Sequence, residues 1–263
     1  MKAIILSAGQ GRRLLPLTED RPKALLSIAG KTIIERQLDV LLAAGIDEIT
    51  IITGFHAHMI DGLISDQYSA YPGIRCVYNP FYDITDNLVS CWIARDAMDG
   101  DFLLINGDTV FEPGLLKVIL NSDPAPVSVC TDVKDVYDND DMKVQVDGLR
   151  VLNISKTIER KDINAESIGL LYFRGNGVDR FRCAVEEELR NPGSLKLWFL
   201  SVVDKLADRE LVNICPVNGY KWCEIDYPGD LERAIGVFEN TGTKDPLDNE
   251  TLEELEGIQH ASG

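Results

Sequence analysis

The sequence predicts an α/β fold in which a mainly parallel β-sheet is flanked by helices and followed by a smaller, mixed β region. Apolar strand-like runs alternate with helix-like runs through the first half of the chain, which is the pattern of a parallel sheet built from βα units. The second half changes to short strands joined by turns. The chain has 263 residues, 45% of them hydrophobic, which is enough for one large domain with a sizeable core.

Four strand–helix repeats make up the first half. Each expected strand is a short apolar run, and each following segment has the length and periodicity of a helix. In sheets of this kind ligands bind beyond the carboxyl ends of the strands, so the residues that follow each strand are the first candidates for a site. Strands are expected at residues 3–6, 48–53, 74–78 and 102–105, and helices at residues 34–44, 56–65, 87–97 and 113–120.

The second half is expected to hold short strands, three helices and two acidic segments. Residues 132–141 are rich in aspartate, but the EF-hand spacing is absent, so this segment is expected to be a solvated loop. Residues 240–263 form a polar, acidic tail with a short helix expected at residues 247–258. Strands are expected at residues 127–131, 143–146, 151–154 and 168–173, and helices at residues 178–190, 196–207 and 227–239.

The segment after the first strand combines glycines with clustered positive charge. Gly9 and Gly11 allow backbone N–H groups to approach oxygen atoms closely. Arginine binds phosphate in a bidentate manner, and lysine adds a point charge. The segment therefore predicts a polyphosphate site, although the whole chain has a formal net charge of −17. The clustered cations are Arg12, Arg13, Arg21 and Lys23.

Two common phosphate motifs do not match this segment. The dinucleotide fingerprint requires a third glycine that opens a helix, but here the chain continues to Leu15 and Pro16. Gly30-Lys31-Thr32 has the ending of a Walker A loop, yet Leu25 stands where the first glycine of that motif belongs. Neither the dinucleotide fingerprint nor the Walker A loop therefore explains the glycines and cations of this segment.

A longer string is more specific. Gly9-x-Gly11-x-Arg13-Leu14, continued by Pro16, Thr18, Pro22 and Lys23, resembles the signature of nucleotidyltransferases that join a nucleoside triphosphate to a phosphorylated small molecule. The resemblance covers about residues 1–238 and extends to Asn106-Gly107-Asp108 and Glu224-Ile225-Asp226. Residues 79–82, 90–92, 142–144 and 154–156 are most similar to the bacterial phosphocholine and 2-aminoethylphosphonate cytidylyltransferases.

This resemblance implies a Rossmann-like (GT-A-like) fold within a single domain of residues 1–239. About residues 1–125 would form the nucleotide-binding half and about residues 126–239 the acceptor-binding half, with Asp226 returning to the metal site. It implies that Lys23 and Arg13 are the catalytic cations and that Asp108 and Asp226 hold Mg²⁺. The implied nucleotide-binding residues are Leu6, Ser7, Ala8, Gly9, Gly11, Arg12, Asn79, Asn87 and Ser90.

The sequence signals for the acceptor-binding residues are less specific than those for the nucleotide site. In the resembled family a lysine at the position of Lys156 binds the acceptor phosphate, and Glu166 lies on the acceptor-side strand. A quaternary ammonium group favours aromatic side chains with carboxylates nearby, although burial in the core is the default for an aromatic residue. The expected acceptor-binding residues are Lys156, Glu166, Trp198, Trp222 and Glu224.

The composition of the chain limits which partners it can bind and where in the cell it is expected. A strongly acidic chain argues against nucleic acid or an anionic membrane as partner. The six cysteines form no Cys-x-x-Cys pair, which favours reduced thiols over a zinc site. No run is long enough to span a membrane and the N-terminal apolar run is too short for a signal peptide, so a cytoplasmic protein is expected. A homodimer is compatible with the sequence.

The sequence thus predicts transfer of CMP from CTP to phosphocholine, 2-aminoethylphosphonate or a similar acceptor, with release of pyrophosphate. Two alternatives stay open. One is a sugar-1-phosphate nucleotidyltransferase that uses UTP, dTTP or GTP, which a panel of donors would distinguish. The other is a non-catalytic, nucleotide-binding regulatory subunit, which the joint presence of Lys23, Arg13, Asp108 and Asp226 disfavours.

Overall fold

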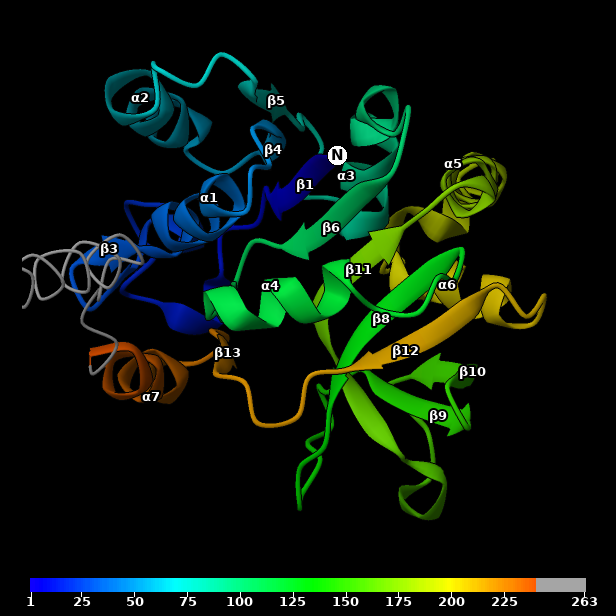
Figure 1. Cartoon of the computed structure of the whole chain (residues 1–263). Coiled ribbons are helices and arrows are strands. Elements are labelled where there is room, and N and C mark those ends of the chain that lie inside the picture. The colour runs from blue at the N-terminus through cyan, green and yellow to red at the C-terminus, as the bar shows by residue number, and fades with distance from the viewer. Residues whose placement is uncertain (240–263) are drawn as a thin grey trace, which may run out of the picture.

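The structure is a computed structural model that describes residues 1–239, and the expected helix at residues 247–258 lies outside this part of the chain. Its centre is a nine-stranded sheet with the strand order β5-β4-β1-β6-β11-β8-β12-β10-β9 (Figure 1). The strands of this sheet are β1 (Lys2–Ser7), β4 (Glu48–Thr53), β5 (Ile74–Tyr78), β6 (Phe102–Asn106), β8 (Val127–Asp132), β9 (Lys143–Asp147), β10 (Arg150–Ser155), β11 (Ala165–Phe173) and β12 (Val212–Pro216).

Helices and two small ribbons complete the described part of the chain. β2 (Ser27–Ile28) pairs with β3 (Lys31–Thr32), and β7 (Thr109–Phe111) pairs with β13 (Trp222–Glu224). The α-helices are α1 (Ile33–Ala43), α2 (Ala57–Gln67), α3 (Asn87–Ile93), α4 (Pro113–Leu120), α5 (Asn176–Glu188), α6 (Leu200–Ala207) and α7 (Pro228–Glu239). The 3₁₀ turns are η1 (Arg12–Leu14), η2 (Lys23–Leu25), η3 (Ala94–Ala97), η4 (Arg160–Asp162) and η5 (Pro192–Lys196).

The first half of the chain forms the parallel part of the sheet. β5, β4, β1 and β6 pair in parallel, and the register places Leu6 of β1 opposite Ile52 and Asn106. All four strands therefore end at the same edge of the sheet. The predicted α/β class and its parallel strand–helix repeats are confirmed.

The second half extends the same sheet with mostly antiparallel strands. β11 pairs antiparallel with β6 and β8, whereas β12 and β8 are parallel. β11 also pairs with β9, so β11, β8, β12, β10 and β9 form a closed ring of strands. Both halves thus share one continuous sheet, and their assignment to nucleotide and acceptor remains a prediction.

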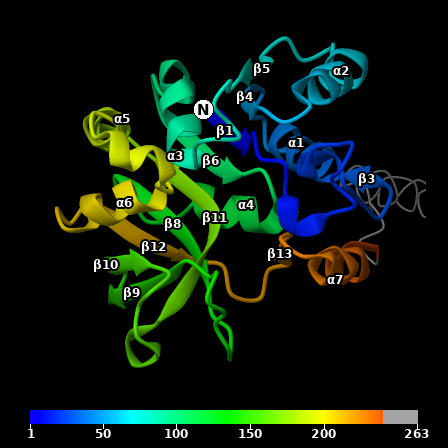
Figure 2. The same cartoon turned by 180° about the vertical axis from the view of Figure 1, so that it is seen from behind.

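Helices cover both faces of the sheet because side chains of successive strand residues point to opposite sides. Ile4 and Leu104 pack in a core with residues of α3, α5 and α6. Ile5 and Ile105 pack in a second core with residues of α1, α2 and α4. Figures 1 and 2 show these two helical layers from opposite sides. The apolar strand runs are therefore buried on both faces, as a parallel sheet requires.

A third, smaller core joins the chain ends of the described region. Leu14, Ile28 and Ile33 from the N-terminal segment pack with Ile225 and with Phe238 of α7. The β7–β13 pairing places Glu224 opposite Thr109, so the late segment returns to the end of β6. This packing brings two segments that are more than one hundred residues apart in the sequence to the same edge of the sheet.

Several boundaries differ from those expected. The helix expected at residues 87–97 is α-helical only to Ile93 and continues as the 3₁₀ turn η3. The helix expected at residues 196–207 begins at Leu200, after the 3₁₀ turn η5. The sequence interpretation also missed β12 and the two small ribbons, whose strands are too short to show a clear period. None of the helices within residues 1–239 has the length and apolarity needed to cross a bilayer.

Candidate active site

A polar cavity of about 400 Å³ opens at the carboxyl ends of β1, β5 and β6. This is the edge at which parallel α/β sheets bind ligands. All of the predicted nucleotide-binding residues line it, together with both predicted catalytic cations and both predicted metal ligands. These residues are Leu6, Ser7, Ala8, Gly9, Gly11, Arg12, Arg13, Lys23, Asn79, Asn87, Ser90, Asp108 and Asp226.

The glycine-rich loop has a shape that requires glycine at Gly11. This residue has φ of +74°, in the left-handed region, and an added Cβ would lie 3.0 Å from the Cβ of Lys23. The buried Thr18 hydroxyl donates a hydrogen bond to the Gly11 carbonyl at 2.9 Å, which fixes the loop. A Cβ at Gly9 would meet open space, so this side of the loop is accessible to a ligand.

Lys23 lies between the two predicted metal ligands. Its Nζ is 2.7 Å from Asp108 Oδ2 and 2.7 Å from Asp226 Oδ1, and its side chain is 11% exposed. Asp108 follows β6, whereas Asp226 follows β13, which pairs with β7 next to β6. Burial opposes the charged form of Lys23, but the charges of the two aspartates outweigh it and raise the lysine pKa.

The two aspartates fit a cation that keeps open coordination positions. Asp108 Oδ1 is buried and has no hydrogen-bond partner. Within residues 1–239 there is no cluster of three or more His, Cys, Asp or Glu side chains arranged to hold a metal. Mg²⁺ is usually bound through one or two carboxylates, with water and substrate phosphates as the other ligands. The pair therefore suits a magnesium ion that binds together with a phosphate substrate.

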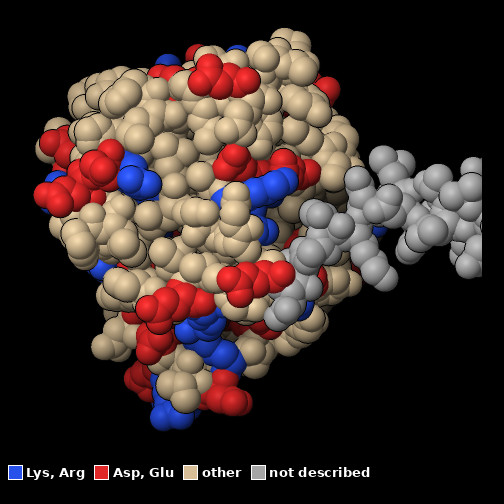
Figure 3. Space-filling view, turned by 90° about the vertical axis from the view of Figure 1, so that its left-hand side faces the viewer, with Lys and Arg blue, Asp and Glu red and all other residues tan. Residues whose placement is uncertain are grey.

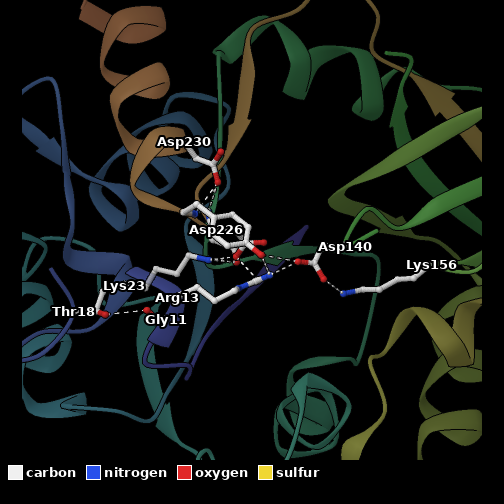
Figure 4. A network of polar contacts seen from close by, with 10 residues as sticks. Gly11, Arg13, Thr18, Lys23, Asp140, Lys156, Asp226 and Asp230 are labelled. Carbon is white, nitrogen blue, oxygen red and sulfur yellow. Dashed lines mark hydrogen bonds and ion pairs between the residues drawn. The ribbon is translucent and has the colours of Figure 1, made fainter. Parts of the chain in front are cut away.

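Arg13 belongs to a network that reaches across the mouth of the cavity (Figure 4). Its guanidinium is 2.7 Å from Asp226 Oδ1 and 2.7 Å from Asp140 Oδ2, and it lies over the ring of Tyr227. The Tyr227 hydroxyl donates a hydrogen bond to Asp140 at 2.9 Å, and Lys156 is 3.5 Å from the other Asp140 oxygen. The aspartate-rich segment 132–141 is thus more than the solvated loop that was expected, because Asp140 contacts two predicted phosphate ligands.

The other two arginines of the predicted cluster differ from each other. Arg12 lines the cavity, and its side chain donates only a long hydrogen bond of 3.4 Å to Gln10. Arg21 pairs with Asp20 on the surface and does not line the cavity. On the face shown in Figure 3, lysine and arginine side chains lie beside acidic ones in small groups. Of the four clustered cations, Arg12, Arg13 and Lys23 therefore line the cavity and Arg21 does not.

The residues expected near the nucleotide base have structural contacts of their own. The buried Asn79 amide donates to the Ser90 hydroxyl at 3.1 Å and accepts from Phe81 N at 2.8 Å. Asn87 is the first residue of α3, after the N-cap Asp86. Its side-chain Oδ1 accepts a hydrogen bond from Phe199 N at 2.9 Å and so holds the start of α6 beside the cavity.

A second cavity, of about 850 Å³, adjoins the first at Asp226. It contains three of the five predicted acceptor residues, namely Glu166, Trp222 and Glu224. Trp222 Nε1 donates to Asp132 at 2.7 Å.

Burial is the main cause that raises the pKa of Glu166 to about 7, although Lys134 is only 2.8 Å away. Burial, followed by the charges of Asp108 and Asp226, raises the pKa of Glu224 to about 8.

The other two predicted acceptor residues lie apart from this group. Lys156 Nζ lies 4.1 Å from the centre of the Trp198 ring, and Trp198 lines the first cavity. The predicted acceptor residues therefore do not share one cavity: Glu166, Trp222 and Glu224 line the second cavity and Trp198 the first. Lys156 lines neither of these two cavities, and it lies 3.5 Å from Asp140, which lines the second. Trp198 and Trp222, which were both expected to bind the acceptor, therefore line different cavities.

Sequence reasoning missed three residues of the site. Asp140 lies in a segment whose composition indicates only solvation, and Tyr227 was read solely as the start of a helix. Asp86 also lines the first cavity, and burial raises its pKa. Only Tyr227 had a signal that could have been used, because it directly follows the predicted metal ligand Asp226.

Comparisons with known proteins identify the family of the chain. The family model described as nucleotidyl transferase matches residues 2–140. CMP-5'-(3-aminopropyl)phosphonate synthase of Streptomyces rubellomurinus is 27% identical over 243 residues, which are 89% of this chain and 38% of that protein. Choline-phosphate cytidylyltransferase of Streptococcus pneumoniae is 33% identical over 147 residues, which are 55% of this chain and 62% of that protein. The chain thus spans less than two thirds of the length of these relatives.

Solved structures show the same fold. CTP:phosphocholine cytidylyltransferase from Streptococcus pneumoniae superposes with a TM-score of 0.76 at 24% identity, over 90% of this chain and 98% of that chain. The inositol-1-phosphate CTP transferase from T. maritima gives a TM-score of 0.75 at 20% identity, over 92% of this chain and 98% of that chain. The predicted α/β architecture is therefore that of known nucleotidyltransferases.

Proposed function

Because the chain belongs to the nucleotidyl transferase family, we propose that it transfers CMP from CTP to a small phosphate or phosphonate acceptor that carries an amine. Pyrophosphate is the second product. One observation carries the proposal. Lys23 is held between Asp108 and Asp226 at 2.7 Å from each, inside a cavity that the glycine-rich loop borders.

The reaction is an in-line displacement at the α-phosphorus of the triphosphate. An oxygen of the acceptor's phosphate or phosphonate forms the new bond to this phosphorus, and the bond from phosphorus to the α,β-bridging oxygen breaks. The electron pair of that bond leaves with pyrophosphate. The attacking oxygen is already ionised at neutral pH, so no general base is required. Catalysis then consists of positioning and of stabilising the negative charge of both reactants.

The cations of the first cavity suit this task. Lys23 would stabilise the charge that develops between the α-phosphate and the leaving group, and Arg13 would bind the leaving phosphates. Asp108 and Asp226 would hold Mg²⁺, which when bound polarises phosphate oxygens as a Lewis acid. Lys23 contacts both aspartates, so it also separates two carboxylates that would otherwise repel each other.

The second cavity supports an acceptor with a positive group. Eight acidic residues line it, against Lys134 and Arg233, and six of them lie outside the pair Glu166 and Glu224 whose pKa is raised to about 7 and about 8. Lys134 is 2.8 Å from both Glu166 and Asp141, so these acids already hold an ammonium group of the chain itself. A relative is named for an aminopropylphosphonate product and another for choline phosphate, and both compounds carry a positively charged nitrogen, an ammonium group in the first and a quaternary ammonium group in the second. The acids are Asp132, Asp138, Asp140, Asp141, Glu166, Glu224, Asp226 and Asp230.

A matrix of pyrophosphate-release assays tests the proposal. CTP, UTP, dTTP, GTP and ATP would each be combined with phosphocholine, 2-aminoethylphosphonate, 3-aminopropylphosphonate and hexose 1-phosphates in the presence of Mg²⁺. We expect release with CTP and an amine-bearing acceptor. Release only with a hexose 1-phosphate would assign the chain to sugar-nucleotide synthesis. Nucleotide binding without release in any combination would contradict the enzymatic proposal and favour a regulatory role.

Asp108→Asn tests the metal assignment within the same assay. The change keeps the side chain's size but removes a charge beside Lys23, and we expect turnover to fall by about 10²-fold or more. Asp123→Asn is the matched control, because Asp123 is an exposed acid outside both cavities. Unchanged turnover in Asp108→Asn would remove Asp108 from the proposed metal site.

A further inference from the structure

Asp140 makes contacts that a surface aspartate does not need for folding. It lies between β8 and β9, yet its carboxylate meets side chains from three other parts of the chain (Figure 4). Oδ2 is 2.7 Å from Arg13 and 2.9 Å from the Tyr227 hydroxyl, and Oδ1 is 3.5 Å from Lys156. Arg13, Lys156 and the Tyr227 hydroxyl, called here the anion seat, therefore surround a single negative group.

The anion seat is accessible to solvent. The side chains of Arg13, Lys156 and Asp140 are 44%, 24% and 48% exposed. Ion pairs this exposed are weak, so another anion can compete for the same cations. A phosphate or phosphonate group is a stronger competitor than one carboxylate, because it has three oxygens and up to two negative charges.

The rest of the loop is anchored independently of Asp140. Lys143 Nζ donates to the Asp138 carbonyl at 2.6 Å and to the Lys156 carbonyl at 2.9 Å. Lys134 pairs with Asp141 and with Glu166 at 2.8 Å. The Asp140 side chain can therefore leave the anion seat while the base of the loop stays in place.

We propose that Asp140 is an internal stand-in for a substrate phosphate or phosphonate group, which displaces it from the anion seat. The inference rests on the proposed function for the identity of the substrate. The group that enters can come from either reactant. It is an outer phosphate of the triphosphate if Arg13 dominates the seat, and the acceptor's phosphate or phosphonate if Lys156 dominates it.

Asp140→Asn tests the proposal because it removes the competing charge and preserves the shape. Its control is Asp135→Asn, which removes the same charge from an exposed position of the same loop that does not touch the seat. Calorimetric titrations would use inorganic pyrophosphate and methylphosphonate as probes. We expect at least one probe to bind Asp140→Asn about two- to fivefold more tightly than it binds either wild type or Asp135→Asn.

Kinetics distinguish the two sources of the anion. A lower KM for CTP alone places the triphosphate in the seat, and a lower KM for the acceptor alone places the acceptor there. Adding Lys156→Met to Asp140→Asn should abolish the gain if the acceptor uses the seat. Equal or weaker binding of both probes in Asp140→Asn, relative to Asp135→Asn, overturns the proposal. The titrations need no turnover, so they remain decisive if pyrophosphate release fails and the proposed function with it.

Discussion

Replacing Lys23 with methionine should separate catalysis from binding. The change keeps the aliphatic stem that packs against Gly11 and removes the ammonium group that lies 2.7 Å from both Asp108 and Asp226. If Lys23 stabilises charge that develops only in the transition state, its loss should reduce kcat far more than nucleotide affinity. Loss of one preorganised electrostatic group typically lowers kcat by about 10²- to 10³-fold.

The same variant should also lose stability. Without Lys23, Asp108 loses the cation beside it, whereas Asp226 keeps its ion pair with Arg13 at 2.7 Å. Breaking a buried ion pair by removing one partner typically costs about 3–5 kcal/mol. Here the aspartate side chains are 23% and 20% exposed, so water screens part of their repulsion. We therefore expect the free energy of unfolding to fall by about 1–3 kcal/mol. Urea unfolding would measure this loss.

Three measurements decide the role of Lys23. Pyrophosphate release gives kcat, calorimetry gives the dissociation constant of the triphosphate, and circular dichroism confirms that the variant is folded under assay conditions. Lys31→Met is the matched control, because Lys31 is half-exposed and pairs only with Asp39 outside the cavity. Equal factors of loss in kcat and in triphosphate affinity would refute a transition-state role and leave Lys23 as a ground-state binding residue.

Two further predictions concern stability. Burial raises the pKa of Glu166 from 4.5 to about 7, so the folded state binds this proton more tightly and wild type loses stability as the pH rises from about 4.5 to 7. The free energy of unfolding of Glu166→Gln, minus that of wild type, should therefore rise by up to about 3 kcal/mol between pH 4.5 and pH 7 in urea unfolding experiments. A difference that stays constant over this pH range would contradict the raised pKa of Glu166. Thr32 caps α1 in a capping box with Glu35, so Thr32→Ala should lower the free energy of unfolding by about 1 kcal/mol and leave KM unchanged. Thermal unfolding with no shift in Tm would show that the cap contributes nothing.

Local patterns were sufficient for the parallel half of the fold. The apolar runs of β1 and β6 gave correct strands because residues buried on both faces must be apolar throughout, whatever the rest of the chain does. Their carboxyl ends share one edge in any such sheet, so Gly11 and Asp108 could be placed near each other from the sequence. Asp226 was placed with them only through the resemblance, since no local pattern connects it with β6.

The acceptor side could not be predicted in the same way. Apart from Glu166 of β11, its residues come from loops and the short strand β13, where no hydrophobic period fixes which way a side chain points. Trp198 and Trp222 were both expected to bind the acceptor, but the segment before α6 and the strand β13 place them beside different cavities. Asp140 could not be recognised from the sequence. The aspartate-rich segment around it indicates only solvation, and nothing in that segment shows that Asp140 contacts Arg13 and Lys156.

The sequence by itself determined the class of fold, and it predicted the glycine-rich loop as a phosphate site and the residue types for chemistry at a phosphate. These features depend on the local hydrophobic period and on side-chain chemistry, and both can be recognised within a single segment of the sequence. Only the tertiary structure decided that Lys23 bridges Asp108 and Asp226 and that Asp140 occupies the seat formed by Arg13, Lys156 and the Tyr227 hydroxyl. Such contacts join segments up to 214 positions apart, and they depend on how the sheet and its ribbons pack together.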